Sequence, residues 1–203
     1  MKRAATAILA ALCSALIAGC SALTMKSGNS EQAWAARRAQ LLQIDRFTLQ
    51  ARVSSGGTLG VKGNLNWRQQ GENFDMRVAG PFGVGATNIA GRGRQVEIRS
   101  AKEVFTTEDP EADIQQRLGW SFPVSHLRYW VLGTPAPGSR AEFELDQAGH
   151  IASLGQDGWE LEYEEYRDAD RLTLPRKFTV SNTHVHIKVV VDGWEIDSSL
   201  RSG

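Results

Sequence analysis

Apolar and polar side chains alternate along most of the chain beyond residue 46. In residues 47–53 the apolar positions are Phe47, Leu49, Ala51 and Val53, and a polar side chain stands between each pair. A period of two is typical of a strand with one buried face and one face in water. The same alternation recurs in residues 59–68, 74–78, 89–98, 141–145, 159–163, 178–180 and 185–191. We therefore predict roughly ten or eleven antiparallel strands, with a hairpin turn at Gly56-Gly57 between the first two.

Helix signals interrupt this alternation in three places. Residues 32–44 are good helix formers, and their apolar side chains approximate one stripe. Asp109, Pro110 and Glu111 provide an N-cap carboxylate, a proline at the first helical position and an acid in the first turn. They predict a helix that ends near Gly119. A further helical segment is expected over residues 125–132, before Gly133 and Pro135.

This balance of elements predicts a mainly β fold. Many alternating strands with few helices favour a closed or nearly closed antiparallel barrel, or a strongly curved sheet. Three helices are too few to cover such a sheet as a second layer. We expect them to form a lid over the partly filled mouth of the barrel, a position where ligands bind.

The N-terminus has the features of an export signal. Lys2 and Arg3 precede fifteen small, mostly apolar residues, a run too short to span a bilayer. The run leads into Ile17-Ala18-Gly19-Cys20, which resembles the lipobox of bacterial lipoproteins, where cleavage precedes an acylated cysteine. We predict a lipoprotein signal peptide over residues 1–19, an acylated Cys20 with a flexible tether over 20–31, and a single domain over 32–203. An ordinary secretory signal with an incidental cysteine is the alternative.

Charge and motif content argue against several function classes. The 23 basic and 23 acidic side chains cancel, so no strong positive field favours nucleic acid. His184 and His186 lie two apart on an expected strand and share a face with Lys188, a pattern that favours solvent-facing histidines over metal ligands. Glu164 and Glu165 are adjacent, so we expect them on opposite strand faces as surface charges. With no nucleophile motif in the chain, we predict no catalysis, no metal and no cofactor.

Several short motifs occur in a specific order and spacing. They are the lipobox, an opening helix with Trp34, the Gly-Pro-Phe-Gly turn at 80–83, Trp-Val-Leu-Gly-Thr-Pro at 130–135, Gly-Trp-Glu-Leu-Glu-Tyr at 158–163, Leu174-Pro175 and the closing segment 187–194. With these motifs the chain resembles the LolB family of outer-membrane lipoprotein receptors along nearly its whole length. The resemblance implies an unclosed antiparallel β-barrel of about 11 strands with a helical lid and an apolar cavity.

The resemblance also implies a function and a location. The cavity would take the acyl chains of a lipoprotein from the soluble periplasmic carrier LolA and release them, without nucleotide, into the inner leaflet of the outer membrane. Ser21 follows Cys20 where many lipoproteins retained in the inner membrane carry aspartate. A monomer anchored through Cys20 at the periplasmic face of the outer membrane is therefore expected.

Two sets of site residues follow from the resemblance. Pro81, Phe82 and Gly83 occupy the turn that in the family usually reads Pro-Leu-Gly, with the leucine protruding and needed for delivery to the membrane. Phe82 could insert into lipid or fold back onto the core. The inward-facing apolar residues could line a cavity or fill a core, and only the resemblance favours the cavity. These residues are Phe47, Leu49, Leu65, Trp67, Phe74, Met76, Leu127, Trp130 and Val131.

Three other functions remain open at this point. The cavity could carry another amphiphile, such as a free fatty acid or a glycolipid. A lipoprotein with a filled core could act as an envelope scaffold. A periplasmic metal-dependent hydrolase would use His184 and His186.

Overall fold

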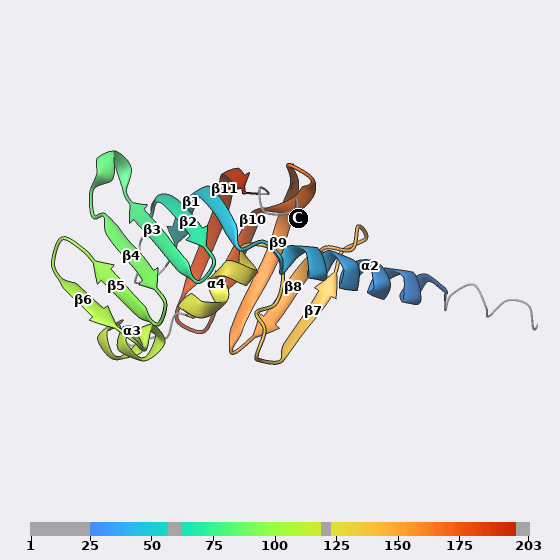
Figure 1. The fold of residues 1–203 in the computed structure, drawn as a ribbon, viewed down its shortest axis with the longest axis horizontal. Helices are drawn as coiled ribbons and strands as arrows, with labels where there is room; N and C mark the ends of the chain where they lie inside the picture. The colour runs from blue at the N-terminus through green and yellow to red at the C-terminus, as the bar shows by residue number, and fades with distance from the viewer. Residues whose placement is uncertain (1–24, 57–61, 119–122, 198–203) are drawn as a thin grey trace, which may run out of the picture. The chain divides into compact units, whose positions relative to one another are not determined.

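A computed structural model describes residues 25–56, 62–118 and 123–197 (Figure 1). The predicted signal peptide, Cys20, Gly57 and Gly119 lie outside the described residues, as do Leu59 and Val61 of the second expected strand. The chain divides into two compact units, residues 1–39 and 40–203. This boundary lies eight residues beyond the expected domain start at Gln32.

Helix α2 (Met25–Leu41) carries the chain from the first unit into the second. It begins seven residues before the predicted helix start at Gln32. Once a helix exists, each added residue contributes another backbone hydrogen bond, and the Ser-Gly-Asn sequence costs too little propensity to prevent this. The helix ends at Leu41, where the Ile44 N–H donates to the Leu41 carbonyl at 3.0 Å in a closing turn. None of the described helices is long and apolar enough to cross a bilayer.

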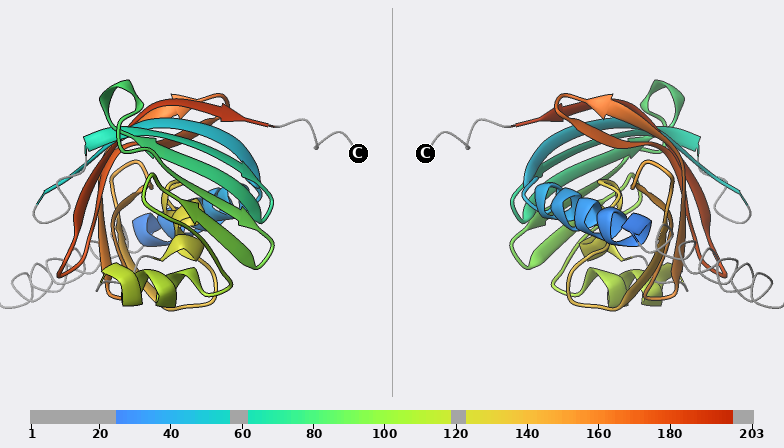
Figure 2. Two further views of the ribbon diagram at one scale, coloured as in Figure 1. Left: turned by 90° about the vertical axis from the view of Figure 1, so that its left-hand side faces the viewer. Right: turned by 90° about the vertical axis from the view of Figure 1, so that its right-hand side faces the viewer.

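The second unit is built on one antiparallel sheet of eleven strands, as predicted. Its spatial order is β6-β5-β4-β3-β2-β1-β11-β10-β9-β8-β7, and the end strands β6 and β7 are not neighbours in the described sheet. The sheet is thus strongly curved but unclosed (Figure 2). The strands are β1 (Arg46–Ser55), β2 (Lys62–Gln70), β3 (Asn73–Ala79), β4 (Thr87–Arg92), β5 (Gln95–Arg99), β6 (Val104–Thr107), β7 (Ala141–Leu145), β8 (Ile151–Gln156), β9 (Trp159–Ala169), β10 (Leu172–Ser181) and β11 (His186–Ile196).

Strand register aligns the inward apolar positions of the first six strands. Each pairing in this part of the sheet places one large apolar side chain opposite another, and cross-strand pairs of this kind stabilise a sheet. The result is a continuous apolar row across the concave face. Its members, in spatial order, are Leu49, Trp67, Met76, Ile89, Ile98 and Phe105.

Two short helices lie between β6 and β7 in the chain, on the concave side of the sheet (Figure 2). Helix α3 (Pro110–Leu118) starts as predicted, because the Asp109 carboxylate accepts the Ala112 N–H at 3.1 Å as an N-cap. Helix α4 (Val124–Trp130) ends before Gly133, whose φ of 76° lies in the left-handed region that favours glycine.

Candidate functional site

An apolar cavity of about 700 Å³ lies between the concave face of the sheet and α4. This volume is typical of sites for small molecules. The cross-strand apolar row forms part of its wall, and α4 contributes Leu127 and Trp130. The remaining apolar side chains in the wall are Val53, Leu65, Val78, Ala79, Val84, Val131, Phe178, Ile187 and Val189.

Trp130 holds α4 in place over this cavity through its indole N–H and its carbonyl. Its indole N–H donates to Gln156 Oε1 at 2.9 Å, and its carbonyl accepts the Tyr163 hydroxyl at 2.8 Å. The side-chain amide of Gln156 is fully used, because it also bonds both backbone polar groups of Ala136 and the hydroxyl of Ser139. Since a buried polar group is costly to leave unpaired, this network fixes the cavity-facing side chain of Trp130.

The structure brings seven of the nine expected lining residues together at the cavity: Leu49, Leu65, Trp67, Met76, Leu127, Trp130 and Val131. Phe47 and Phe74 do not line it, and that expectation is corrected. Phe47 is buried between Trp67 and Trp194, with ring centroids 5.4 Å from each. Phe74 lies over its cross-strand neighbour Gly91, where a Cβ would come within 2.2 Å of the ring.

Several lining residues were missed from the sequence. Ile89, Ile98 and Ile187 belong to predicted strands and have the inward parity of the alternation, which was the signal that could have identified them. Phe105 lies on the four-residue strand β6, which is too short to show a clear period.

The turn between β3 and β4 joins the cavity to an exposed apolar side chain. Pro81–Gly83 forms a single 3₁₀ turn, and the Gly80 N–H donates to the Val84 carbonyl at 2.9 Å across its base. Gly80 and Val84 border the cavity, whereas Phe82 at the apex is fully exposed. Figure 1 shows this turn projecting beyond the strands. The side chain of Phe82 therefore does not fold back onto the core.

The backbone at the apex is held in an uncommon conformation. Phe82 has φ 58° and ψ 20°, in the left-handed region, which costs a residue with a side chain about 1–2 kcal/mol. Gly83 follows with φ 79°, where glycine carries no such cost. A strained, fully exposed aromatic residue contributes nothing to the core, and such features concentrate at functional sites.

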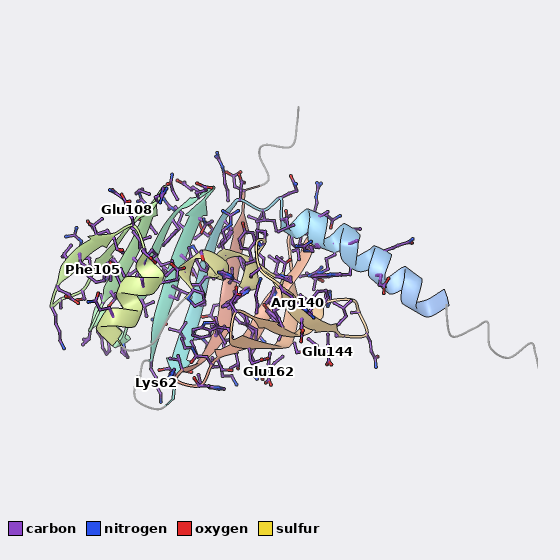
Figure 3. The ribbon with its side chains drawn as sticks, turned by 90° about the horizontal axis from the view of Figure 1, so that it is seen from below. Lys62, Phe105, Glu108, Arg140, Glu144 and Glu162 are labelled. Atoms are coloured by element: carbon purple, nitrogen blue, oxygen red, sulfur yellow. The ribbon has the colours of Figure 1, made fainter. Side chains whose placement is uncertain are left out.

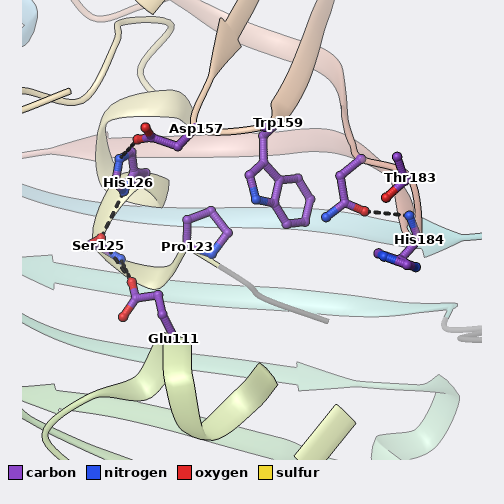
Figure 4. Close-up of a pocket in the computed structure, with 10 residues that line it drawn as sticks. Glu111, Pro123, Ser125, His126, Asp157, Trp159, Thr183 and His184 are labelled. Atoms are coloured by element: carbon purple, nitrogen blue, oxygen red, sulfur yellow. Dashed lines mark hydrogen bonds and ion pairs between the residues drawn. The ribbon is translucent and has the colours of Figure 1, made fainter. Parts of the chain in front are cut away.

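A second, polar pocket of about 380 Å³ lies beside α4 (Figure 4). Ser125 Oγ donates to Glu111 Oε1 at 3.0 Å and lies 2.9 Å from His126 Nδ1, and His126 Nε2 lies 2.8 Å from Asp157 Oδ2. The hydroxyl proton of Ser125 is therefore engaged by Glu111 rather than by the imidazole. The chain of contacts joins α3, α4 and the turn between β8 and β9.

His184 and His186 do not lie on the same strand. Strand β11 begins at His186, and His184 lies in the preceding turn, where its N–H donates to Asn182 Oδ1 at 2.8 Å. The expectation that both point to one strand face is therefore wrong. Both side chains are exposed, and the described residues contain no group of three His, Cys, Asp or Glu side chains placed to hold a metal.

Glu164 and Glu165 each form ion pairs with basic side chains. Lys177 pairs with Glu164, and Lys188 lies 3.4 Å from the same carboxylate. Glu165 pairs with Arg176 at 2.6 Å. Hydrogen bonding from Lys177 holds the pKa of Glu164 below its ordinary value, so this carboxylate stays charged as a surface group does.

Comparison with known proteins agrees with this architecture. The family model described as outer membrane lipoprotein LolB matches residues 45–194. The outer-membrane lipoprotein LolB of Stutzerimonas stutzeri is 34% identical over 200 residues, covering 93% of this chain and 94% of the relative. That of Pseudomonas putida is 34% identical over 187 residues, with 89% and 91% covered.

Solved structures with low sequence identity share the fold alone. A DUF1329 family protein from Desulfovibrio piger has a TM-score of 0.55 at 10% identity, covering 83% of this chain and 92% of that one. A LolA superfamily protein from Nitrosomonas europaea has a TM-score of 0.50 at 9% identity, with 81% and 92% covered. Since the family model spans the sheet from β1 to β11 and relatives above 30% identity cover nearly the whole chain, this protein belongs to the LolB family of outer-membrane lipoproteins.

Proposed function

We propose that this protein is a lipoprotein receptor of the outer membrane. It accepts acylated lipoproteins from the periplasmic carrier LolA and inserts them into the inner leaflet of the outer membrane. The observation that carries this proposal is the continuity between the cavity and the Pro81–Gly83 turn. Gly80, Val84 and Gly85 border the cavity, and the same turn exposes Phe82 completely. An acyl chain leaving the cavity along this turn meets an apolar apex suited to enter lipid.

The energetics of acyl chains favour a direct transfer. Burial is worth about 0.8 kcal/mol per CH₂, so a chain of about 15 such groups gains on the order of 12 kcal/mol. Release into water would be prohibitively slow at this cost. Transfer from cavity to cavity avoids exposing the chain, and it proceeds without nucleotide when each successive site binds more favourably.

Acylation of Cys20 would supply the location. The lipobox at Ile17–Cys20 supports an anchor there, and Ser21 supports sorting to the outer membrane. In this arrangement the anchor keeps a monomeric receptor at the periplasmic face of the outer membrane, and the domain supplies the cavity.

Cargo transfer between purified proteins tests the proposal. The receptor is mixed with carrier loaded with a lipoprotein, without nucleotide, and the two species are separated. We expect the cargo to move onto this protein. Cargo that remains on the carrier would contradict the receptor function.

A further inference from the structure

Charge is distributed unequally between the two halves of the sheet. Residues 62–107, which contain β2 to β6, carry seven Lys and Arg against four Asp and Glu. Residues 141–169, which contain β7 to β9, carry one Arg against nine Asp and Glu. Figure 3 shows Lys62 at the start of β2, and Glu144 and Glu162 on the other half. The half with net positive charge is the one that bears Phe82.

Two cations of this half flank the base of the Phe82 turn. The carbonyl oxygen of Lys62 lies 3.6 Å from the position of a Cβ on Gly80, so the backbone at Lys62 runs beside the first residue of the turn. Arg77 lies two residues before the end of β3 and has the outward parity, between the inward-facing Met76 and Val78. Both Lys62 and Arg77 are exposed.

Within the described residues, these two cations have no carboxylate partner of the kind that Arg92 and Arg99 have. Arg77 donates to the neutral amide oxygen of Asn88 at 3.2 Å, and no ion pair joins Lys62 or Arg77 to a carboxylate within the described residues. By contrast, Arg92 at the far end of β4 binds the carboxylate of Asp75 at 2.7 Å. The positive charges of Lys62 and Arg77 thus remain available to an external anion.

A third cation extends this surface. Asn88 on β4 is the register partner of both Arg77 on β3 and Arg99 on β5. The two arginines therefore lie two strand spacings apart, or about 10 Å. The ion pair of Arg99 with Glu97 is exposed and therefore weak. The spread of these cations around an apolar apex matches a plane of phosphate groups better than a single small anion.

We propose that Lys62 and Arg77 bind the phosphate groups of anionic phospholipids where Phe82 enters the membrane. This inference rests on the proposed function and adds the lipid class that the turn prefers. The acidic β7–β9 half is repelled by the same surface, so the charge asymmetry orients the turn toward the membrane. Each basic side chain near an anionic bilayer raises the affinity for the membrane about fivefold, and salt screens this attraction.

A fluorescent probe at the apex tests this binding. Cleavage of the proposed signal peptide removes Cys13, and acylation blocks the thiol of Cys20. Phe82→Cys therefore provides a single free thiol in the mature chain, which is labelled with an apolar, polarity-sensitive dye. The acylated protein is anchored in vesicles of phosphatidylcholine, with or without phosphatidylglycerol, at low and high salt. We expect a larger blue shift with phosphatidylglycerol at low salt.

Two matched double variants test whether the effect depends on where the positive charges lie. Lys62→Gln with Arg77→Gln removes two such side chains and should lower the ratio of inserted to non-inserted protein about 25-fold on phosphatidylglycerol vesicles. Arg68→Gln with Arg94→Gln removes the same charge at the opposite end of this half of the sheet, near the end of β2 and in the turn between β4 and β5, and should have little effect. Both control residues are exposed.

The remaining outcomes separate this inference from the proposed function. Equal blue shifts on both vesicle types would overturn the phosphate contact and leave insertion of the turn standing. An equal loss in both double variants would also overturn the site, because net charge alone would then explain the effect. An aqueous signal on all anchored vesicles would overturn insertion by Phe82 and the inference together.

Discussion

The hydroxyl of Tyr163 donates a 2.8 Å hydrogen bond to the carbonyl of Trp130 and so joins β9 to the end of α4. Both residues are buried, and Trp130 is only 1% exposed. The same carbonyl also accepts the Gly133 N–H at 3.0 Å, so the Tyr163 hydroxyl is its second donor. The bond from Tyr163 connects the sheet directly to the residue that covers the cavity.

Removing this hydroxyl should destabilise the fold. Tyr163→Phe removes one of two hydrogen bonds to the Trp130 carbonyl, which keeps the Gly133 N–H as a donor, so the unfolding free energy should fall by about 0.5–1.5 kcal/mol. Urea denaturation followed by fluorescence measures the change. Tyr129→Phe is the control, because Tyr129 is less buried and its hydroxyl bonds no described residue; its effect should stay within about 0.5 kcal/mol. Equal midpoints for Tyr163→Phe and the parent protein would refute the assigned role.

Because the Tyr163 hydroxyl is buried, we expect the protein to lose stability at alkaline pH. Burial raises the pKa of Tyr163 well above its ordinary value, with a smaller contribution from Tyr166. The folded protein therefore keeps this proton at a pH where the unfolded chain has lost it. The resulting stability is complete below about pH 10 and declines by up to about 1.4 kcal/mol per pH unit above it, until the folded pKa is reached.

Urea midpoints measured against pH check this titration. The stability difference between the parent protein and Tyr163→Phe should shrink above about pH 10, since only the parent can lose this proton. A difference that stays constant into the alkaline range would show that Tyr163 does not titrate as described.

Phe82→Glu should separate acceptance of cargo from its delivery. The Phe82 side chain is fully exposed, so the unfolding free energy should change by less than about 0.5 kcal/mol. Loss of an apolar side chain worth about 1.5–3 kcal/mol in lipid predicts at least about tenfold slower insertion into vesicles. Acceptance from the carrier should persist.

Circular dichroism and a vesicle insertion assay test this separation. Phe82→Leu, which keeps an apolar side chain at the apex, is the control and should insert normally. An unfolded Phe82→Glu protein would show that the side chain supports the core, and undiminished insertion would remove its role in delivery.

Filling the cavity should weaken cargo binding without unfolding the sheet. Leu65 lines the cavity and is only half-buried, so Leu65→Trp has room to project into the open volume. If the indole displaces about two methylene groups of a bound chain, affinity should fall about 15-fold. Binding of a fluorescent acyl probe measures this loss.

Asn66→Trp is the matched control for this variant. Asn66 is the next residue on β2, faces outward and is exposed, so its replacement should leave probe affinity unchanged. Equal affinities for both variants would place the bound chain outside this cavity.

Short-range patterns in the sequence were sufficient for several elements. The alternation at Phe47–Val53 predicted β1, because a strand with one buried face requires a period of two. Asp109 and Pro110 predicted the start of α3, because an N-cap depends only on neighbouring residues. Strands β6 and β8 were not among the predicted segments, since β6 has four residues and the buried Ile151 and Leu154 of β8 lie three apart.

The sequence by itself determined which side chains face inward, because parity along a strand is a local property. Only the tertiary structure decided which of them line the cavity. Phe47 and Leu49 share a strand and a face, yet Phe47 packs against Trp194 and Trp67 while Leu49 borders the cavity. Phe74 is held over Gly91, seventeen residues further along the chain. Strand register and sheet curvature bring these distant residues together, and they divide one apolar face into a packed end and a hollow one.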